Sequence, residues 1–415
     1  MKTSLRLNSN AAPLLLCLGT GVFLWLLLSL GHDYVPYVRL PSLRTGDAAD
    51  AAGSGPDSSA TDAVVPEQTL ITDTTNPPPP ARENIPNTVH YVYILANATH
   101  GDFSFAFSEV LSIYAASKYW QPDAIYLHTN APDAALERAR SGAAGKWTAL
   151  LFAVPNLHIA AATVPTHAAN GKEIHLMEHK SDFVRVAALR EHGGAYLDFD
   201  VHPLRSVRAL LESGFAAVAG RQQGDNAEVN SGAFFTKPHS RMIELWSEGM
   251  HAAFTGEWSA HSNGALTAVC ENLVAAAPGA EVLIMERNAF APGSWMREET
   301  IGLLEVHEEE PSSWAMRGAD GSLPRYEEEP MTRWTAPAKG RDRPEWAQDW
   351  SKTYMLHAFN HNQKDFEIPG FDRITPRYIL ERRSNMARAV YPVARELYEQ
   401  GLIDIDDPYK FNVEE

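Results

Sequence analysis

Two carboxylates at the end of a short apolar run are the residues of this chain best suited to chemistry. Asp198 and Asp200 stand two positions apart, directly after 195–197. On a β-strand, residues i and i+2 project to the same side, so both carboxylates can face one point in space. Oxygen ligands of this kind suit a hard divalent cation such as Mg²⁺ or Mn²⁺. The pair therefore predicts a cation site, and such a cation suits a substrate that carries phosphates.

A second charged pair precedes these acids. Asp182 and Arg185 are three residues apart within 174–192, whose periodicity predicts a helix, so they share one helix face. One interpretation is a surface ion pair, which contributes only about 0–1 kcal/mol. Next to a cation site, the same side chains become hydrogen-bond partners for sugar hydroxyls, because a carboxylate accepts and a guanidinium donates.

Two glycines separate this predicted helix from the acids. Gly193 and Gly194 allow the chain to leave the helix with unusual dihedral angles and bring the next strand close to a ligand. They also serve as an ordinary helix C-terminus. Tyr196 follows them, and it can belong either to the core or to the lining of the site.

Predicted strands and helices alternate around these residues. The predicted strands are 88–95, 124–129, 195–197, 215–219, 233–236 and 282–285, and the predicted helices are 105–119, 174–192, 240–254 and 265–277. Such alternation indicates an α/β fold with a largely parallel central sheet. In open sheets of this type, ligands bind beyond the carboxyl ends of strands, which is where the two acids stand.

The N-terminal part predicts a membrane anchor and a stem. Residues 11–30 carry no charge and are as long as one bilayer-spanning helix. A cleaved signal peptide has a shorter apolar core of roughly 7–15 residues, so we favour an uncleaved anchor. Residues 1–10 would then be a short cytoplasmic tail, and residues 31–84, rich in small and polar residues and proline, a disordered stem. The globular body, 85–415, would lie on the lumenal side.

Composition limits the partners. The chain has 415 residues, of which 45% are hydrophobic, enough for a large core. Its formal net charge is −17 and it has no basic cluster, so no nucleic-acid partner is expected. Only two cysteines occur, Cys17 in the apolar run and Cys270 in the body, so no intrachain disulfide framework is expected.

The segment Ser181–Asp200 resembles the sugar-binding region of DXD-containing glycosyltransferases of the family 32 type. It reads SDFVRVAALREHGGAYLDFD and matches all nine fixed positions of the pattern S-D-x-x-R-x-x-x-L-x-x-x-G-G-x-Y-x-D-x-D. This type includes α-1,6-mannosyltransferases, inositolphosphoceramide mannosyltransferases and α-1,4-galactosyltransferases, and the pattern also resembles that of clostridial glucosylating toxins. A bare D-x-D is unspecific, whereas nine positions in one row are specific.

The resemblance extends to three shorter segments. Residues 85–90 (IPNTVH) are similar to the opening of the family's first strand, and 230–232 (NSG) to an N-x-G segment that lines the pocket. Residues 354–360 are similar to a late histidine followed by an aromatic residue and an asparagine, although the usual tryptophan after His357 is missing. The fold implied is a single nucleotide-diphospho-sugar transferase domain of the GT-A-like type.

The same resemblance implies roles for the site residues. Asp200 would coordinate the metal directly, and Asp198 would contact the ribose or reach the metal through water. His357 would be the third metal ligand, with His307 and His361 as competitors. The donor sugar would be held by Asp182, Arg185, Tyr196, Asn230 and Gly232, and the nucleotide would lie against Val92 and Tyr93.

The implied reaction is the metal-dependent transfer of a hexose from a UDP- or GDP-sugar, with retention of configuration, to a glycan, glycoprotein or glycolipid hydroxyl. The cofactor would be Mn²⁺ or Mg²⁺. Together with the anchor, this predicts a single-pass type II protein of the Golgi or endoplasmic reticulum membrane. The donor sugar, the base, the acceptor and the group that acts in the retaining step stay open.

Two other functions are compatible with parts of the sequence. The first is a catalytically inactive, sugar-binding partner subunit of the same fold, against which the intact acids and the Asp182/Arg185 pair argue. The second is an aspartyl-phosphate phosphatase, which also uses D-x-D. That class places Thr or Val where this chain has His202, and it needs a later G-D-x-x-x-D motif that is missing here.

Overall fold

The computed structural model describes residues 83–223, 228–276, 279–326, 344–359 and 366–411. The predicted cytoplasmic tail and anchor, and the stem up to residue 82, lie outside these ranges. None of the helices within them has the length and apolar character that crossing a bilayer requires. The anchor therefore stays a prediction.

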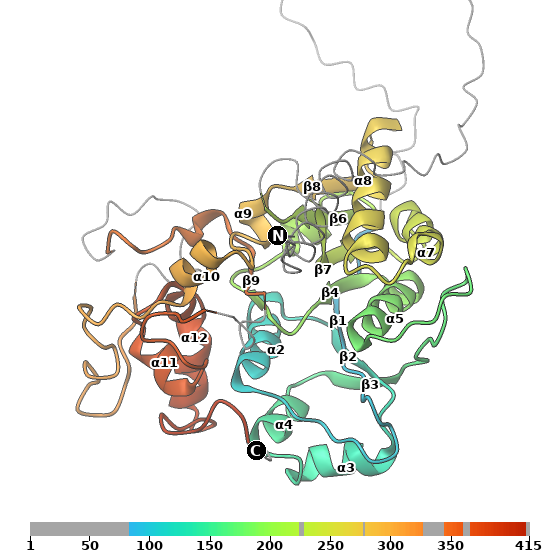
Figure 1. The fold of residues 1–415 in the computed structure, drawn as a ribbon. Coiled ribbons are helices and arrows are strands. Elements are labelled where there is room, and N and C mark those ends of the chain that lie inside the picture. The colour runs from blue at the N-terminus through green and yellow to red at the C-terminus, as the bar shows by residue number, and fades with distance from the viewer. Residues whose placement is uncertain (1–82, 224–227, 277–278, 327–343, 360–365, 412–415) are drawn as a thin grey trace, which may run out of the picture. The chain divides into compact units, whose positions relative to one another are not determined.

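A seven-stranded sheet in the order β3-β2-β1-β4-β7-β6-β8 forms the centre of the described part (Figure 1). Its strands are β1 (Thr88–Val92), β2 (Ala124–Thr129), β3 (Leu157–Ala161), β4 (Gly194–Leu197), β6 (Ala217–Arg221), β7 (Val229–Thr236) and β8 (Val282–Met285). Strands β3, β2, β1 and β4 run parallel, as do β6 and β8, whereas β7 is antiparallel to β4 and β6. The predicted α/β class is confirmed, and the sheet is mixed and mostly parallel.

Helices cover both faces of this sheet. The helices of the described residues are α2 (Phe107–Trp120), α3 (Asp133–Ser141), α4 (Lys146–Phe152), α5 (Met177–His192), α6 (Arg208–Leu211), α7 (Arg241–Ala253), α8 (Ala265–Ala276), α9 (Arg287–Phe290), α10 (Arg297–Leu304), α11 (Pro376–Glu381) and α12 (Asn385–Glu399). A π-helical turn, Ala260–Gly264, leads into α8. Strands β5 (Val201–Pro203) and β9 (Met355–His357) form a separate antiparallel pair.

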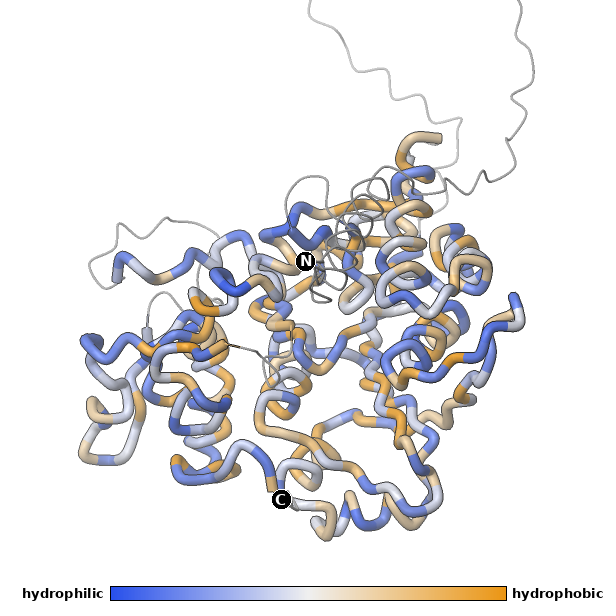
Figure 2. The backbone as a smooth tube through the Cα atoms, viewed as in Figure 1, coloured by the Kyte–Doolittle hydropathy of each residue, from blue (hydrophilic) through white to orange (hydrophobic). Residues whose placement is uncertain are grey.

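Two hydrophobic cores lie on the two faces of the sheet. Because neighbouring strand residues point to opposite faces, Phe234 of β7 packs with Trp246 of α7, whereas Phe235 joins the core that contains Phe107 and Tyr391. Helices α5, α7 and α8 cover the first face, and α2 lies on the second, with α12 packed against α2 (Figure 1). Figure 2 shows apolar residues recurring along the strands and along the helices that cover them.

Several predicted boundaries differ from the observed ones. Strand β1 ends at Val92 rather than at residue 95, and α5 begins at Met177 rather than at residue 174. Strand β7 begins at Val229, four residues before the predicted start, because the polar segment before residue 233 is buried strand. Its polar groups are hydrogen-bonded there, as shown by the Gly232 amide, which donates to Asn230 Oδ1 at 2.6 Å.

The two glycines after α5 are needed for close packing. Gly193 and Gly194 have φ angles of +64° and +98°, a region that side chains rarely adopt. A Cβ on Gly194 would lie 2.2 Å from Thr88 Oγ1, and one on Gly193 would lie 2.5 Å from Pro238 Cδ. The prediction that these glycines let the chain leave the helix with unusual dihedral angles is therefore confirmed.

Candidate active site

Asp198 and Asp200 lie in a tight turn directly after β4. The Asp198 amide donates to the Gly232 carbonyl of β7 at 2.8 Å, and the Val201 amide donates to the Asp198 carbonyl at 3.0 Å. The Asp200 carbonyl accepts from the Ala358 amide at 2.8 Å. The expectation that strand alternation aligns the two carboxylates was wrong, because β4 ends at Leu197. The turn that follows β4 brings them together instead, and it is held by its hydrogen bonds to Gly232 of β7 and to Ala358, the residue after β9.

Both carboxylates meet His357. One ligand atom from each of the three side chains lies within 4.8 Å of the others. His357 Nε2 is 3.4 Å from Asp200 Oδ1, and the β5–β9 pairing that aligns Val201 with His357 sets this position. Of the competing histidines, His307 contacts Glu309 and stacks on Trp346, and His361 lies outside the described residues.

These three side chains fit a divalent cation. Two carboxylates and one imidazole are a donor set that Mn²⁺ accepts. Within the described part of the chain, His357 Nδ1 is buried and has no hydrogen-bond partner. Gly232 faces the same space, since a Cβ there would lie 2.7 Å from Asp198 Oδ2 and 2.8 Å from His357 Cε1. A glycine at this position therefore keeps the space between two candidate ligands open.

Arg185 connects the other predicted pair to the acids. Its guanidinium lies 3.0 Å from Asp182 Oδ1 and 3.1 Å from Asp198 Oδ1, and it donates to the Ser231 carbonyl at 2.9 Å. Asp182 and Arg185 are only 7% and 6% exposed, so the surface ion-pair interpretation is wrong. Because the pair is buried and reaches Asp198, it fixes the position of that carboxylate.

Tyr196 is both a core residue and a neighbour of the acids. It is buried, and its hydroxyl donates to Asp198 Oδ1 at 2.6 Å. The Arg185 guanidinium lies over its ring at 4.5 Å. Burial raises the pKa of Asp198, the Arg185 charge opposes this, and the Asp200 charge adds to it. A cation bound between Asp198 and Asp200 would therefore reduce the electrostatic repulsion between their two carboxylates.

Sequence reasoning missed His261. This side chain of the π-helical turn is completely buried, and its Nε2 donates to Asp182 Oδ2 at 2.9 Å. From the same turn, Asn263 Oδ1 accepts from the Ser231 amide at 2.9 Å. The turn therefore supports two of the residues that contact Arg185, namely Asp182 and Ser231. No local spacing could have revealed this contact, because 79 residues separate His261 from Asp182.

The remaining predicted residues surround the acids in different ways. Asn230 is buried and donates to Gln222, so its side chain shapes the strand around Gly232. Val92 ends β1, next to β4. Tyr93 follows, and its hydroxyl accepts from the Ser104 amide at 3.2 Å. Contacts of these residues with a donor stay predictions.

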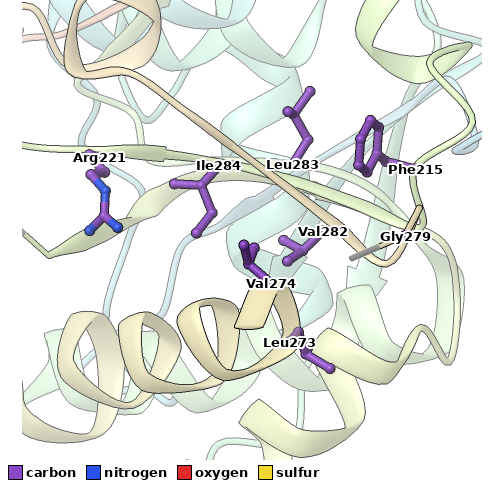
Figure 3. Close-up of a pocket in the computed structure, with 8 residues that line it drawn as sticks. All are labelled: Phe215, Arg221, Leu273, Val274, Gly279, Val282, Leu283 and Ile284. Carbon is purple, nitrogen blue, oxygen red and sulfur yellow. The ribbon is translucent and has the colours of Figure 1, made fainter. Parts of the chain in front are cut away.

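An apolar pocket of about 580 Å³ between β8 and α8 contains none of these residues. Figure 3 shows Val274 of α8 and Val282 and Ile284 of β8 directed toward the space between the helix and the strand. Leu273 and Phe215 add further apolar surface. This pocket has no acid in its lining, so it does not fit the chemistry of the Asp198 turn.

Residues 90–216, which include this turn, match the family model described as glycosyltransferase sugar-binding region containing DXD motif. This match supports the enzyme class of a transferase of glycosyl groups. Over these residues the chain is similar to DXD-containing glycosyltransferases, and this similarity supports a glycosyltransferase.

Similar proteins include one curated relative, "Glucan organizing enzyme 1" of Cryptococcus neoformans var. grubii serotype A. It is 26% identical over 186 residues, which cover 43% of this chain and 47% of that protein. The match thus spans about half the length of the relative.

Among solved structures, "PaToxG Glycosyltransferase" is 16% identical, with a TM-score of 0.33, over 48% of this chain and 72% of that one. The apo glycosyltransferase GlyE of Streptococcus pneumoniae TIGR4 is 10% identical, with a TM-score of 0.36, over 76% of this chain and 64% of that one.

Proposed function

We propose that this glycosyltransferase moves a hexose from a nucleotide-diphosphate sugar to a hydroxyl of a glycan or glycolipid, with the help of a divalent cation. The observation that carries the proposal is the cluster of Asp198, Asp200 and His357 within 4.8 Å. The buried Arg185 beside Asp198 supports it, because that ion pair fixes one candidate ligand. Manganese or magnesium would fit this donor set.

Asp198, Asp200 and His357 would hold the cation. When bound, the cation would offset the negative charge that grows on the diphosphate leaving group. Arg185 and Tyr196 keep Asp198 in place through contacts of 3.1 Å and 2.6 Å, so this ligand needs little reorganisation when the donor binds. Val92 and Tyr93 would lie against the nucleotide at the end of β1.

The sugar-holding role of Asp182 takes a more specific form in this geometry. Both of its oxygens already have partners, Arg185 and His261. A donor hydroxyl that binds Asp182 would therefore have to share a carboxylate oxygen with Arg185 or His261. We propose that Asp182 acts mainly by holding Arg185, and that Arg185 is the group nearer to the donor.

The stereochemistry and the setting are further parts of the proposal. The resemblance to the family 32 type, with its GT-A-like fold, implies that the anomeric configuration is retained, which NMR of the first product would test. The apolar run 11–30 supports a single-pass anchor in the Golgi or endoplasmic reticulum membrane with the body in the lumen. Protease protection of the body in sealed microsomes would test that orientation. We propose to try glucans among the first acceptors, because the curated relative is named "Glucan organizing enzyme 1".

The test is donor hydrolysis by the purified full-length chain. UDP- and GDP-hexoses are incubated with Mn²⁺, with Mg²⁺ and with a chelator, and release of the nucleotide is measured. We expect hydrolysis of one donor that requires the cation and is lost in Asp200→Asn. Asp372→Asn is the matched control, since that acid is 93% exposed. Hydrolysis by Asp200→Asn at the wild-type rate would refute the proposal, and a folded chain inert toward every donor would favour the inactive partner subunit.

A further inference from the structure

Three aromatic rings in contact, those of His357, Phe359 and Trp295, extend from the candidate cation ligands (the cation cluster) to the surface. The ring of Phe359 stacks on that of His357, with centroids 3.9 Å apart and planes at 13°. Trp295 meets Phe359 edge-on at 5.5 Å. Trp295 is 42% exposed and its neighbour Met296 is 52% exposed. Large apolar side chains that stay exposed beside a functional site often mark a binding surface.

The backbone holds Phe359 in an unusual conformation. Its φ angle is +53°, which bulky residues seldom adopt. Such conformations persist where the surrounding structure enforces them, and they cluster at ligand-binding positions. In this conformation the Phe359 ring stacks on His357 and lies at a steep angle to the Trp295 ring.

The loop that carries Trp295 is fixed at both ends. The Arg287 guanidinium donates to the carbonyls of Ala291 and Pro292 at 3.4 Å and 3.2 Å and pairs with Glu299. At the other end, the Ser294 hydroxyl accepts from the Met296 amide at 3.1 Å. A tryptophan on a loop tied in this way is held in place, so a ligand that stacks on it loses little affinity to ordering.

The start of the same loop is connected to the base of the site. Ala291 forms a parallel β-bridge with Gln222. Gln222 in turn accepts a hydrogen bond from the Asn230 side chain, which shapes the strand next to Gly232. Two separate paths, one through His357 and one through Asn230, therefore place Trp295 at the rim of the cation cluster.

We propose that Trp295 and Phe359 form a platform for the acceptor sugar. The apolar C–H face of a pyranose ring would stack on the indole. This inference rests on the proposed function, since it names the subsite of that same reaction. The donor's diphosphate belongs with Asp198 and Asp200, whereas Trp295 stands two rings outward, where the acceptor arrives.

The first experiment compares two reactions of the full-length Trp295→Ala variant. Donor hydrolysis in Mn²⁺ needs no acceptor, and transfer to p-nitrophenyl gluco-, galacto- and mannopyranosides does. We expect unchanged hydrolysis and a rise of about tenfold in the acceptor KM, equal to about 1.4 kcal/mol. Trp295→Phe should recover most of the loss. The matched control is Trp258→Ala, since Trp258 is 67% exposed and its ring contact is with His179.

A second measurement does not depend on turnover. Saturation-transfer NMR with methyl hexopyranosides and gluco-, galacto- and manno-configured disaccharides reports binding to the wild type and to Trp295→Ala. Loss of a wild-type signal in the variant supports the platform, even if no donor is hydrolysed and the proposed function fails. Three results would overturn the platform. They are an unchanged acceptor KM in Trp295→Ala, the absence of a sugar signal from an active wild type, and a raised donor KM in hydrolysis by the variant. The last is the result expected if the nucleotide base stacks on Trp295.

Discussion

Replacing Gly232 with alanine tests whether the space between the candidate ligands is functional. Gly232 lies in β7 and its φ angle is not in the left-handed region, so the backbone accepts alanine. The added Cβ would lie 2.7 Å from Asp198 Oδ2 and 2.8 Å from His357 Cε1. The perturbation therefore acts on two proposed cation ligands at once without adding charge or polarity.

The geometry sets the size of the effect. Ordinary contacts of a Cβ begin at 3.4 Å, so each of the two groups must move by roughly two thirds of an ångström. Cation ligands tolerate only about ±0.2 Å. Changes next to ligands of this kind typically cost about 10–100-fold in metal affinity or activity. We therefore expect Mn²⁺ affinity to fall by about 1.4–2.7 kcal/mol, with a parallel loss of kcat for donor hydrolysis.

Electron paramagnetic resonance titration of Mn²⁺ measures this loss directly, with donor hydrolysis as the second readout. Gly249→Ala is the matched control, because a Cβ there meets nothing within 4 Å in the middle of α7. That control should bind Mn²⁺ normally and gain roughly 0.5–1 kcal/mol of stability. A Gly232→Ala protein with wild-type Mn²⁺ affinity and activity would show that the ion is not held by Asp198 and His357.

Two other variants test the buried network and a partly buried acid. His261→Phe leaves Asp182 Oδ2 without its hydrogen-bond partner, so the free energy of unfolding, measured by urea denaturation, should fall by about 1–3 kcal/mol. His261→Gln should recover part of this loss. Equal stability of the two variants would contradict the prediction. Burial raises the pKa of Glu109 from 4.5 to about 7, so the folded protein favours the protonated, neutral carboxyl group. The contribution of this group to the free energy of unfolding is therefore fully present below pH 4.5 and is lost as the pH rises through 7. Glu109→Gln should therefore be more stable than wild type at pH 8 by roughly 3 kcal/mol, and the difference should nearly disappear at pH 4.5; a difference independent of pH would argue against a raised pKa.

The part of the site within twenty consecutive residues was predictable. Ser181–Asp200 gave the end of α5, the two glycines, β4 and the acids in the right order, because each of these features depends on neighbouring residues. The helix spacing placed Asp182 and Arg185 on one face, as observed at 3.0 Å. Burial of that pair could not be read from the spacing, since helices and strands distant in sequence cover it.

The rest of the site depends on contacts between distant segments. His357 reaches Asp200 through the pairing of β5 with β9, two strands of three residues each that carry no periodic signal. His261 reaches Asp182 from a π-helical turn. The antiparallel β7 was not expected either, because alternating strands and helices imply parallel neighbours and the direction of one inserted strand depends on tertiary packing.

The central claim is that Asp198, Asp200 and His357 hold a divalent cation, and Mn²⁺ binding to the full-length chain tests it most directly. Titration followed by electron paramagnetic resonance should show saturable binding to the wild type. Binding should be lost in Asp200→Asn and weakened in His357→Ala, while Asp372→Asn binds normally. Wild-type affinity in Asp200→Asn, or the absence of saturable binding to the wild type in the presence of UDP and GDP, would contradict the account.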